Sequence, residues 1–64
     1  MFSNNLYNLM LQATEEHKSL WRIKDEYLKD AEGADDCKAF WQALAMDKEK
    51  HIQDLEALIK KHMV

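Results

Sequence analysis

Five ionisable residues in two short stretches have types and spacing that could do chemistry. Glu16 and His17 occur together in "TEEHK", and Asp47, Lys48 and His51 occur together in "MDKEKHI". Carboxylates and imidazoles bind divalent metal ions, and the same groups form ion pairs and hydrogen bonds with an ammonium. A charged group that faces a protein core is costly unless it is paired. What these residues do therefore depends on whether the fold brings the two stretches together.

Two amphipathic helices are predicted to carry the two stretches. Apolar residues recur at three- and four-residue spacing in both halves of the chain, proline is absent, and the single glycine is Gly33 in "DAEGADD". A glycine just past a helix end supplies a left-handed cap. The sequence predicts an all-α antiparallel helical hairpin, with helices near 4–32 and 35–62 in a single domain over residues 1–64.

The predicted helix ends have their own signals. Ser3 is the expected N-cap of the first helix, and Phe2 and Tyr7 have the spacing of a hydrophobic staple. Asp35 or Asp36 can accept hydrogen bonds from the free N–H groups that begin the second helix.

The apolar faces of both predicted helices have a polar gap. The inward positions of the first helix fall on Glu16 and His17 in its middle, and Lys48 and His51 interrupt the apolar face of the second. When a hairpin folds about its single glycine, facing residue numbers sum to about 66. Glu16 then comes within one turn of Lys48 and His51, so the two gaps meet.

The same numbering predicts an aromatic cluster beside the turn. Tyr27 and Ile23 should face Phe40 and Trp41, because these numbers also sum to about 66. We expect this cluster to anchor one end of the hairpin.

The apolar faces are wider than contact between two helices requires. A chain of 64 residues rarely builds a sufficient core alone, and Cys37, its single cysteine, cannot form an internal disulfide. We expect Cys37 to be a buried thiol on the apolar face of the second helix. Because wide apolar faces cover more than one neighbour, the sequence predicts a homodimer or higher homo-oligomer, most simply two hairpins in a four-helix bundle. The residues that widen the faces are Tyr7, Leu11, Trp21, Leu28, Ala45 and Met63.

Composition and motifs exclude several function classes. A net charge of −3 argues against a nucleic-acid surface, and no apolar run approaches the roughly 20 residues that span a membrane. A lone cysteine without a signal-like apolar segment predicts a cytoplasmic protein. There is no Gly-rich phosphate loop, nucleophile elbow or CxxC pair. We therefore expect a non-enzymatic protein of assembly or interaction type.

Two interpretations of the polar gap remain open. In the first, Glu16 pairs with Lys48, the histidines hydrogen-bond nearby, and the layer fixes register and oligomeric state. In the second, Glu16, His51, His17 and Asp47 bind iron, manganese or zinc, since four-helix bundles hold metals with inward carboxylates and imidazoles.

The segment "AFWQALAMDKEKHIQDL" resembles the second helix of a ferritin-like, rubrerythrin-type helix pair, and "ATEEHKSLWRIKDEY" is similar to the first helix. The resemblance implies that His51 matches the ligand histidine and that Glu15 or Glu16 lies near the first-helix ligand. The family has a bridging carboxylate three residues before that histidine. This chain has Lys48 there, with Asp47 one position earlier. Because an ammonium repels two metal cations, the resemblance implies a reduced metal site or a lost one.

Overall fold

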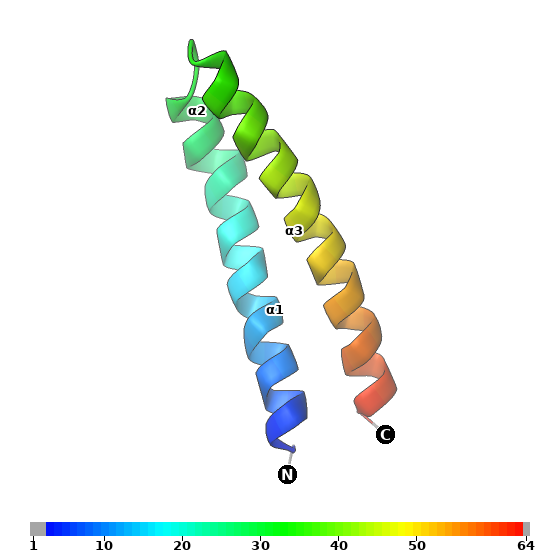
Figure 1. Cartoon of the computed structure of the whole chain (residues 1–64). Coiled ribbons are helices and arrows are strands. Elements are labelled where there is room, and N and C mark those ends of the chain that lie inside the picture. Colours follow the sequence, from blue (N-terminus) through cyan, green and yellow to red (C-terminus); the bar gives the residue numbers. More distant parts are fainter. Residues whose placement is uncertain (1–2, 64) are drawn as a thin grey trace.

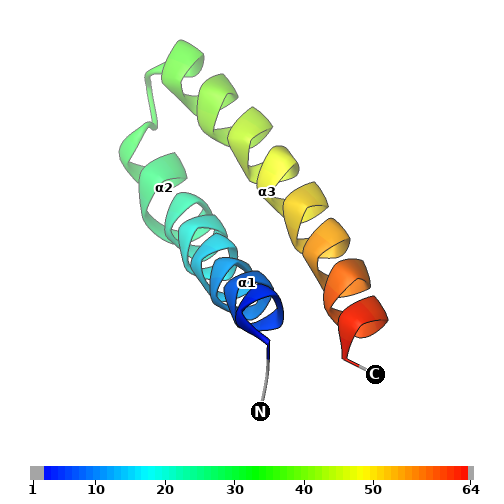
Figure 2. The same ribbon diagram turned by 60° about the horizontal axis from the view of Figure 1, so that its bottom comes forward.

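Two helical arms run side by side in opposite directions in the computed structural model, which describes residues 3–63 (Figure 1). A short turn at residues 31–33 joins the arms, and the start of α1 and the end of α3 lie at the opposite end of the hairpin from this turn (Figure 2). The all-helical hairpin predicted from the sequence is therefore present. Its elements in chain order are α1 (Asn4–Arg22), the π turn η1 (Ile23–Tyr27), α2 (Leu28–Asp30) and α3 (Asp35–His62).

The first arm begins at its predicted cap. The hydroxyl of Ser3 accepts a hydrogen bond from the backbone N–H of Leu6 at 3.1 Å, which confirms Ser3 as the N-cap of α1. Phe2, which the sequence pairs with Tyr7 in a hydrophobic staple, lies outside the described residues.

The turn depends on one glycine. Gly33 has a φ of 90°, a left-handed conformation that costs other residues energy. The first arm ends at Asp30, two residues before the predicted end, because the chain has turned by residues 31–33. At the start of α3, the side chain of Asp36 accepts from the backbone N–H of Cys37 at 2.8 Å, while the N-cap residue Ala34 supplies no side-chain bond. Of the two predicted capping aspartates, Asp36 is thus the one in this role.

The π turn η1 was not predicted. In it the backbone N–H of Leu28 bonds to the carbonyl of Ile23, five residues back, so one more residue is accommodated than in an α-helical turn. An unbroken α-helix would turn Leu28 away from α3 and bring Asp30 closer to it. With the extra residue, Leu28 is half-buried and Asp30 is exposed.

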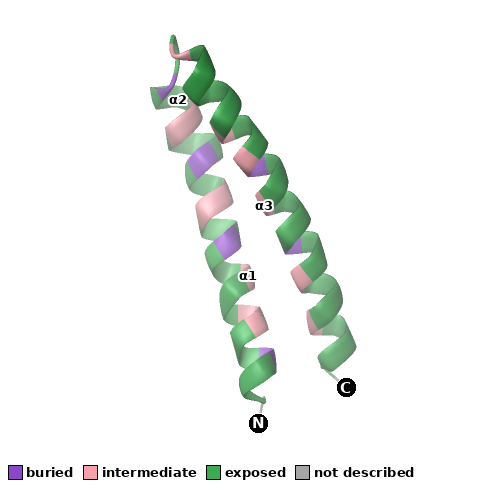
Figure 3. Cartoon of the chain, in the orientation of Figure 1, coloured by how far each residue is buried: buried purple, intermediate pink, exposed green. Residues whose placement is uncertain are grey.

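The core is a single line of side chains between the arms. Ile23, at 1% exposed, is the most buried side chain among the described residues. The rings of Tyr27 and Trp41 lie 4.7 Å apart between their centroids, and Phe40 meets Trp41 edge-on at 5.2 Å. The expected contact between Tyr27 and Trp41 is therefore confirmed, but Phe40, which was expected to face inward, is 59% exposed. Figure 3 shows buried and half-buried residues recurring along both arms, with exposed residues over the rest. The buried apolar residues are Leu6, Ile23, Ala31, Ala45 and Ile52.

The hairpin is long and thin, and it leaves much apolar surface in water. Its dimensions are 48 × 15 × 13 Å, and its Cα radius of gyration is 14.6 Å, against about 10.7 Å for a compact domain of the same length. Within residues 3–63, seven large apolar side chains are more than two-fifths exposed: Tyr7, Leu11, Trp21, Phe40, Met46, Leu58 and Met63.

Candidate functional site

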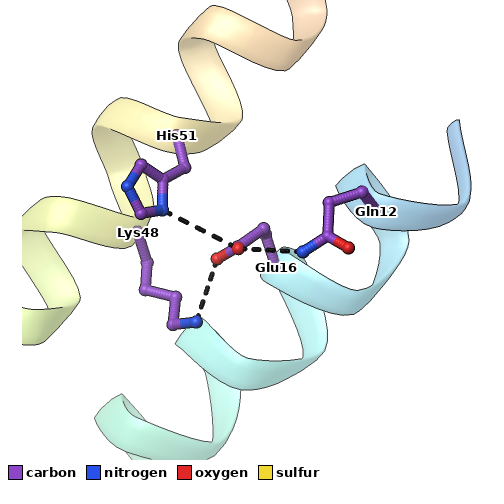
Figure 4. A network of polar contacts seen from close by, with 4 residues as sticks. All are labelled: Gln12, Glu16, Lys48 and His51. Carbon is purple, nitrogen blue, oxygen red and sulfur yellow. Dashed lines mark hydrogen bonds and ion pairs between the residues drawn. The ribbon is translucent and has the colours of Figure 1, made fainter. Parts of the chain in front are cut away.

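A polar network crosses the seam between the arms near their middle (Figure 4). Glu16 of α1 lies at its centre. The Nζ atom of Lys48 is 3.1 Å from Oε2 of Glu16, and Nδ1 of His51 is 3.7 Å from Oε1. The amide of Gln12 donates a hydrogen bond to Oε1 at 3.1 Å. The two stretches identified in the sequence therefore do come together.

Helical spacing places each member of the network. Gln12 and Glu16 are four residues apart on α1, and Lys48 and His51 are three apart on α3, so each pair lies on one side of its helix. The side chain of Glu16 is 10% exposed, that of Lys48 is 21% exposed, and that of His51 is 55% exposed. The network therefore runs from a buried carboxylate outward to an imidazole at the rim.

Glu16 is a buried charge that its neighbours keep ionised. Burial alone raises the pKa of the Glu16 carboxyl. The contacts with Lys48 and Gln12, together with the positive charges of Lys48 and His51, outweigh burial and hold the pKa below its ordinary value of 4.5. The folded protein therefore favours the carboxylate form of Glu16.

One oxygen of Glu16 is compensated by charge rather than by a hydrogen bond. Oε2 is buried and has no hydrogen-bond partner within the described residues. The Lys48 ammonium lies 3.1 Å from Oε2, so its positive charge compensates this oxygen. Another cation would have to displace Lys48 to reach Oε2.

Two of the four predicted metal ligands lie in the network and two do not. The structure brings Glu16 and His51 together, with Lys48 between the arms beside them. His17 was expected to face inward, but it is exposed because it lies one residue, or about 100°, around the helix from Glu16. Asp47 is also exposed, one residue from Lys48 on the side away from the seam.

Gln12 was not predicted from the sequence. Its side-chain amide donates to the carboxylate of Glu16 from the same helix. The available signal was its position four residues before Glu16, the spacing at which a glutamine and an acidic side chain meet on a helix.

The network does not amount to a metal site within one chain. Across residues 3–63, no three His, Cys, Asp or Glu residues are grouped closely enough to hold a metal ion. Glu16 and His51 would supply two ligands, and a complete site would need more from elsewhere.

The prediction of a buried Cys37 thiol is wrong. Cys37 is exposed. It borders a shallow apolar hollow beside the turn, together with Tyr27, Ala34 and Trp41. At this end of the hairpin, the first arm does not extend over the side chains in the first turn of α3, so Cys37 stays in contact with solvent.

Comparison of the chain with protein-family models, with curated proteins and with solved structures finds no match. The ferritin-like resemblance therefore stays a prediction. None of the helices in the described part of the chain is both long enough and apolar enough to cross a membrane.

Proposed function

We propose that this chain is a small non-enzymatic assembly protein that works as a homodimer, with two hairpins packed as a four-helix bundle. The observation that carries the proposal is the apolar surface of the isolated hairpin. Trp21 is 62% exposed, Phe40 is 59% exposed and Tyr7 is 57% exposed. Large apolar side chains in such numbers on a small protein are typical of an interaction surface.

The size of the exposed surface fits one partner of the same kind. The chain has an accessible surface of 5157 Å², whereas a compact monomer of 7.6 kDa has about 4300 Å². The difference, roughly 850 Å², matches the roughly 800 Å² that each partner buries in a specific interface of standard size. A single homodimer contact would therefore bring the chain to the surface area of an ordinary folded protein.

The network around Glu16 has a role in this proposal. It lies near the middle of both arms, so two hairpins packed in opposite directions bring both copies of the network to the same level. A buried polar layer disfavours registers that leave its charges unpaired. We infer that Glu16, Lys48 and His51 fix how the helices align.

The oligomeric state tests this proposal directly. Sedimentation equilibrium at micromolar concentration should give a mass of twice 7.6 kDa, with a melting temperature that rises with protein concentration. A cooperatively folded monomer, whose melting temperature does not depend on concentration, would contradict the proposal. A tetramer would keep the apolar contact and correct the number of subunits.

A second candidate function is metal binding, and one observation favours it. The carboxylate of Glu16 and the imidazole of His51 lie side by side. Two copies of this pair in a dimer would supply two carboxylates and two imidazoles, a ligand set suited to iron, manganese or zinc. The Lys48 ammonium opposes this, because it occupies the position beside Oε2 that a cation would take. Metal analysis of protein purified without an affinity tag is the first test.

A further inference from the structure

We propose that a second copy of the chain docks on one side of α3, with the two α3 helices antiparallel and centred near residue 49. The inference rests on the proposed homodimer and identifies the face that forms it. We call this face the α3 flank, and its residues are Phe40, Leu44, Asp47, His51 and Leu58.

The α3 flank is a continuous stripe beside the seam of the hairpin, and its half-buried Leu44 and its network residue His51 lie at the edge nearest the seam. At about 100° per residue, its members fall within an arc of about 60°, and the centre of this arc lies about a third of a turn around α3 from the seam residues Ala45 and Ile52. Phe40 is 59% exposed and Leu58 is 43% exposed, although both are apolar. A second helix can therefore dock on this stripe beside the contact between α3 and α1, as neighbouring helices do in a four-helix bundle.

Charge selects the α3 flank over the apolar side of α1. The first turn of α3 contains Asp35 and Asp36, and its last turn contains Lys60, Lys61 and His62. Two antiparallel copies of α3 therefore place an acidic end beside a basic end twice. By contrast, the first turn of α1 has no acidic residue. Antiparallel pairing of α1 with itself would gain no such attraction.

The register follows from the spacing of the flank residues about residue 49. Phe40 of one subunit meets Leu58 of the partner subunit, because the two positions are equally far from residue 49 on opposite sides of it. Asp47 of one subunit meets His51 of the partner subunit for the same reason. The twofold axis repeats both pairings, so two apolar contacts flank two central pairs of opposite charge when His51 is protonated. The exposed Asp47, unused in the network of the single chain, thereby gains a partner.

Matched truncations on the two helices test which face docks. Phe40→Ala and Leu58→Ala should weaken dimerisation at least about tenfold, as is usual for anchors of an interface. Trp21→Ala and Leu11→Ala are the controls. They remove side chains of similar exposure, 62% for Trp21 and 47% for Leu11, from the other helix and should weaken dimerisation less than the α3 flank variants do. Circular dichroism of each variant shows whether the hairpin itself still forms.

Cross-linking tests the register without disturbing the fold. In a Cys37→Ser background, Lys50→Cys places a thiol at the rim of the α3 flank, close to the proposed twofold axis. A short bis-maleimide should join two copies of this variant. Glu49→Cys is the control on the same helix, because Glu49 is exposed and, at about 100° per residue, lies on the side of α3 opposite the α3 flank. It should not cross-link at the same protein concentration.

The outcomes separate this inference from the homodimer on which it rests. A dimer that is weakened by Trp21→Ala but not by Phe40→Ala would overturn the α3 flank and leave the homodimer standing. A dimer that cross-links through position 49 rather than position 50 would do the same. A wild-type chain that stays monomeric would overturn both proposals.

Discussion

The ammonium of Lys48 lies 3.1 Å from Oε2 of Glu16, and this ion pair joins α3 to α1 near the middle of both helices. It is much less exposed than the ion pair that Lys24 forms with Glu49 between the arms. A pair in this position specifies alignment more than it adds stability, because removing both charges from water offsets most of their attraction.

Breaking the buried pair from one side should destabilise the fold. Lys48→Ala leaves the Glu16 carboxylate buried without its cation, and we expect the free energy of unfolding to fall by about 2 kcal/mol. Urea denaturation at pH 7 measures the loss. Replacing both partners, as in Glu16→Leu with Lys48→Met, should restore most of the stability, because no charge is then stranded.

The second ion pair between the arms is the matched control. Lys24 and Glu49 approach to 2.8 Å, but their side chains are 57% and 47% exposed. Lys24→Ala should change the free energy of unfolding by less than about 0.5 kcal/mol. Equal losses of stability for Lys24→Ala and Lys48→Ala would mean that the burial of Glu16 does not make its ion pair more important than an exposed one.

Acid should destabilise the hairpin partly through Glu16. Because its pKa in the folded chain lies below the ordinary value of 4.5, the ionised carboxylate contributes stability that is fully present above that value. This contribution is lost as the pH falls from 4.5 through the lower folded-state pKa. Glu16→Gln should show a smaller loss of stability over that range. Glu49→Gln, which removes an exposed carboxylate, should keep the wild-type loss.

Trp41 should anchor the turn end of the hairpin. Its ring contacts Tyr27 across the seam and Phe40 on its own helix. Trp41→Ala should lower the free energy of unfolding by on the order of 3 kcal/mol. Thermal denaturation of Trp41→Ala and Trp21→Ala at equal concentration checks this, because the exposed Trp21 should cost the hairpin less than about 1 kcal/mol. An unchanged melting curve for Trp41→Ala would mean that the aromatic cluster does not hold the arms together.

Changing Lys48 to glutamate tests the metal candidate. Lys48→Glu puts a carboxylate three residues before His51, on the same side of α3 and beside Glu16. Without metal, the clustered negative charge should lower the melting temperature. Ferrous iron, manganese or zinc should restore it, because a ligand that binds only the folded state stabilises that state.

The wild-type chain is the reference for this experiment. With Lys48 beside Glu16, it should gain little melting temperature from any of the three metals. A gain of several degrees in the wild type that His51→Ala abolishes would favour metal binding over the register role. If neither chain responds, the network is structural.

Much of the hairpin and part of the network could be predicted from local sequence signals. A single glycine, the cap at Ser3 and regular apolar spacing are enough to predict two arms and the turn between them. Counting from Gly33 was enough to bring Glu16 near Lys48. These predictions succeeded because each depends on position along a helix, which the sequence gives directly.

The remaining features depend on side-chain direction and on how much surface two helices can cover. His17 and Asp47 lie next in sequence to network residues, yet both are exposed because one step around a helix turns a side chain by about 100°. Cys37 has the spacing of a buried residue, but only one neighbouring helix is there to cover it. The π turn was not predicted, because a five-residue spacing between Ile23 and Leu28 looks like a small irregularity in the apolar pattern of an ordinary α-helix.

The π turn divides the first arm into two segments whose helical phases differ. Residues up to Ile23 follow one phase, and residues from Leu28 onward follow another that lags behind it because of the added residue. Deleting one residue within η1 would put both segments back in a single phase. It would also swing the turn and the start of α3 by up to about 100° around the axis of the first arm. The direction in which α3 leaves the turn is therefore set several residues before the glycine at which the chain bends.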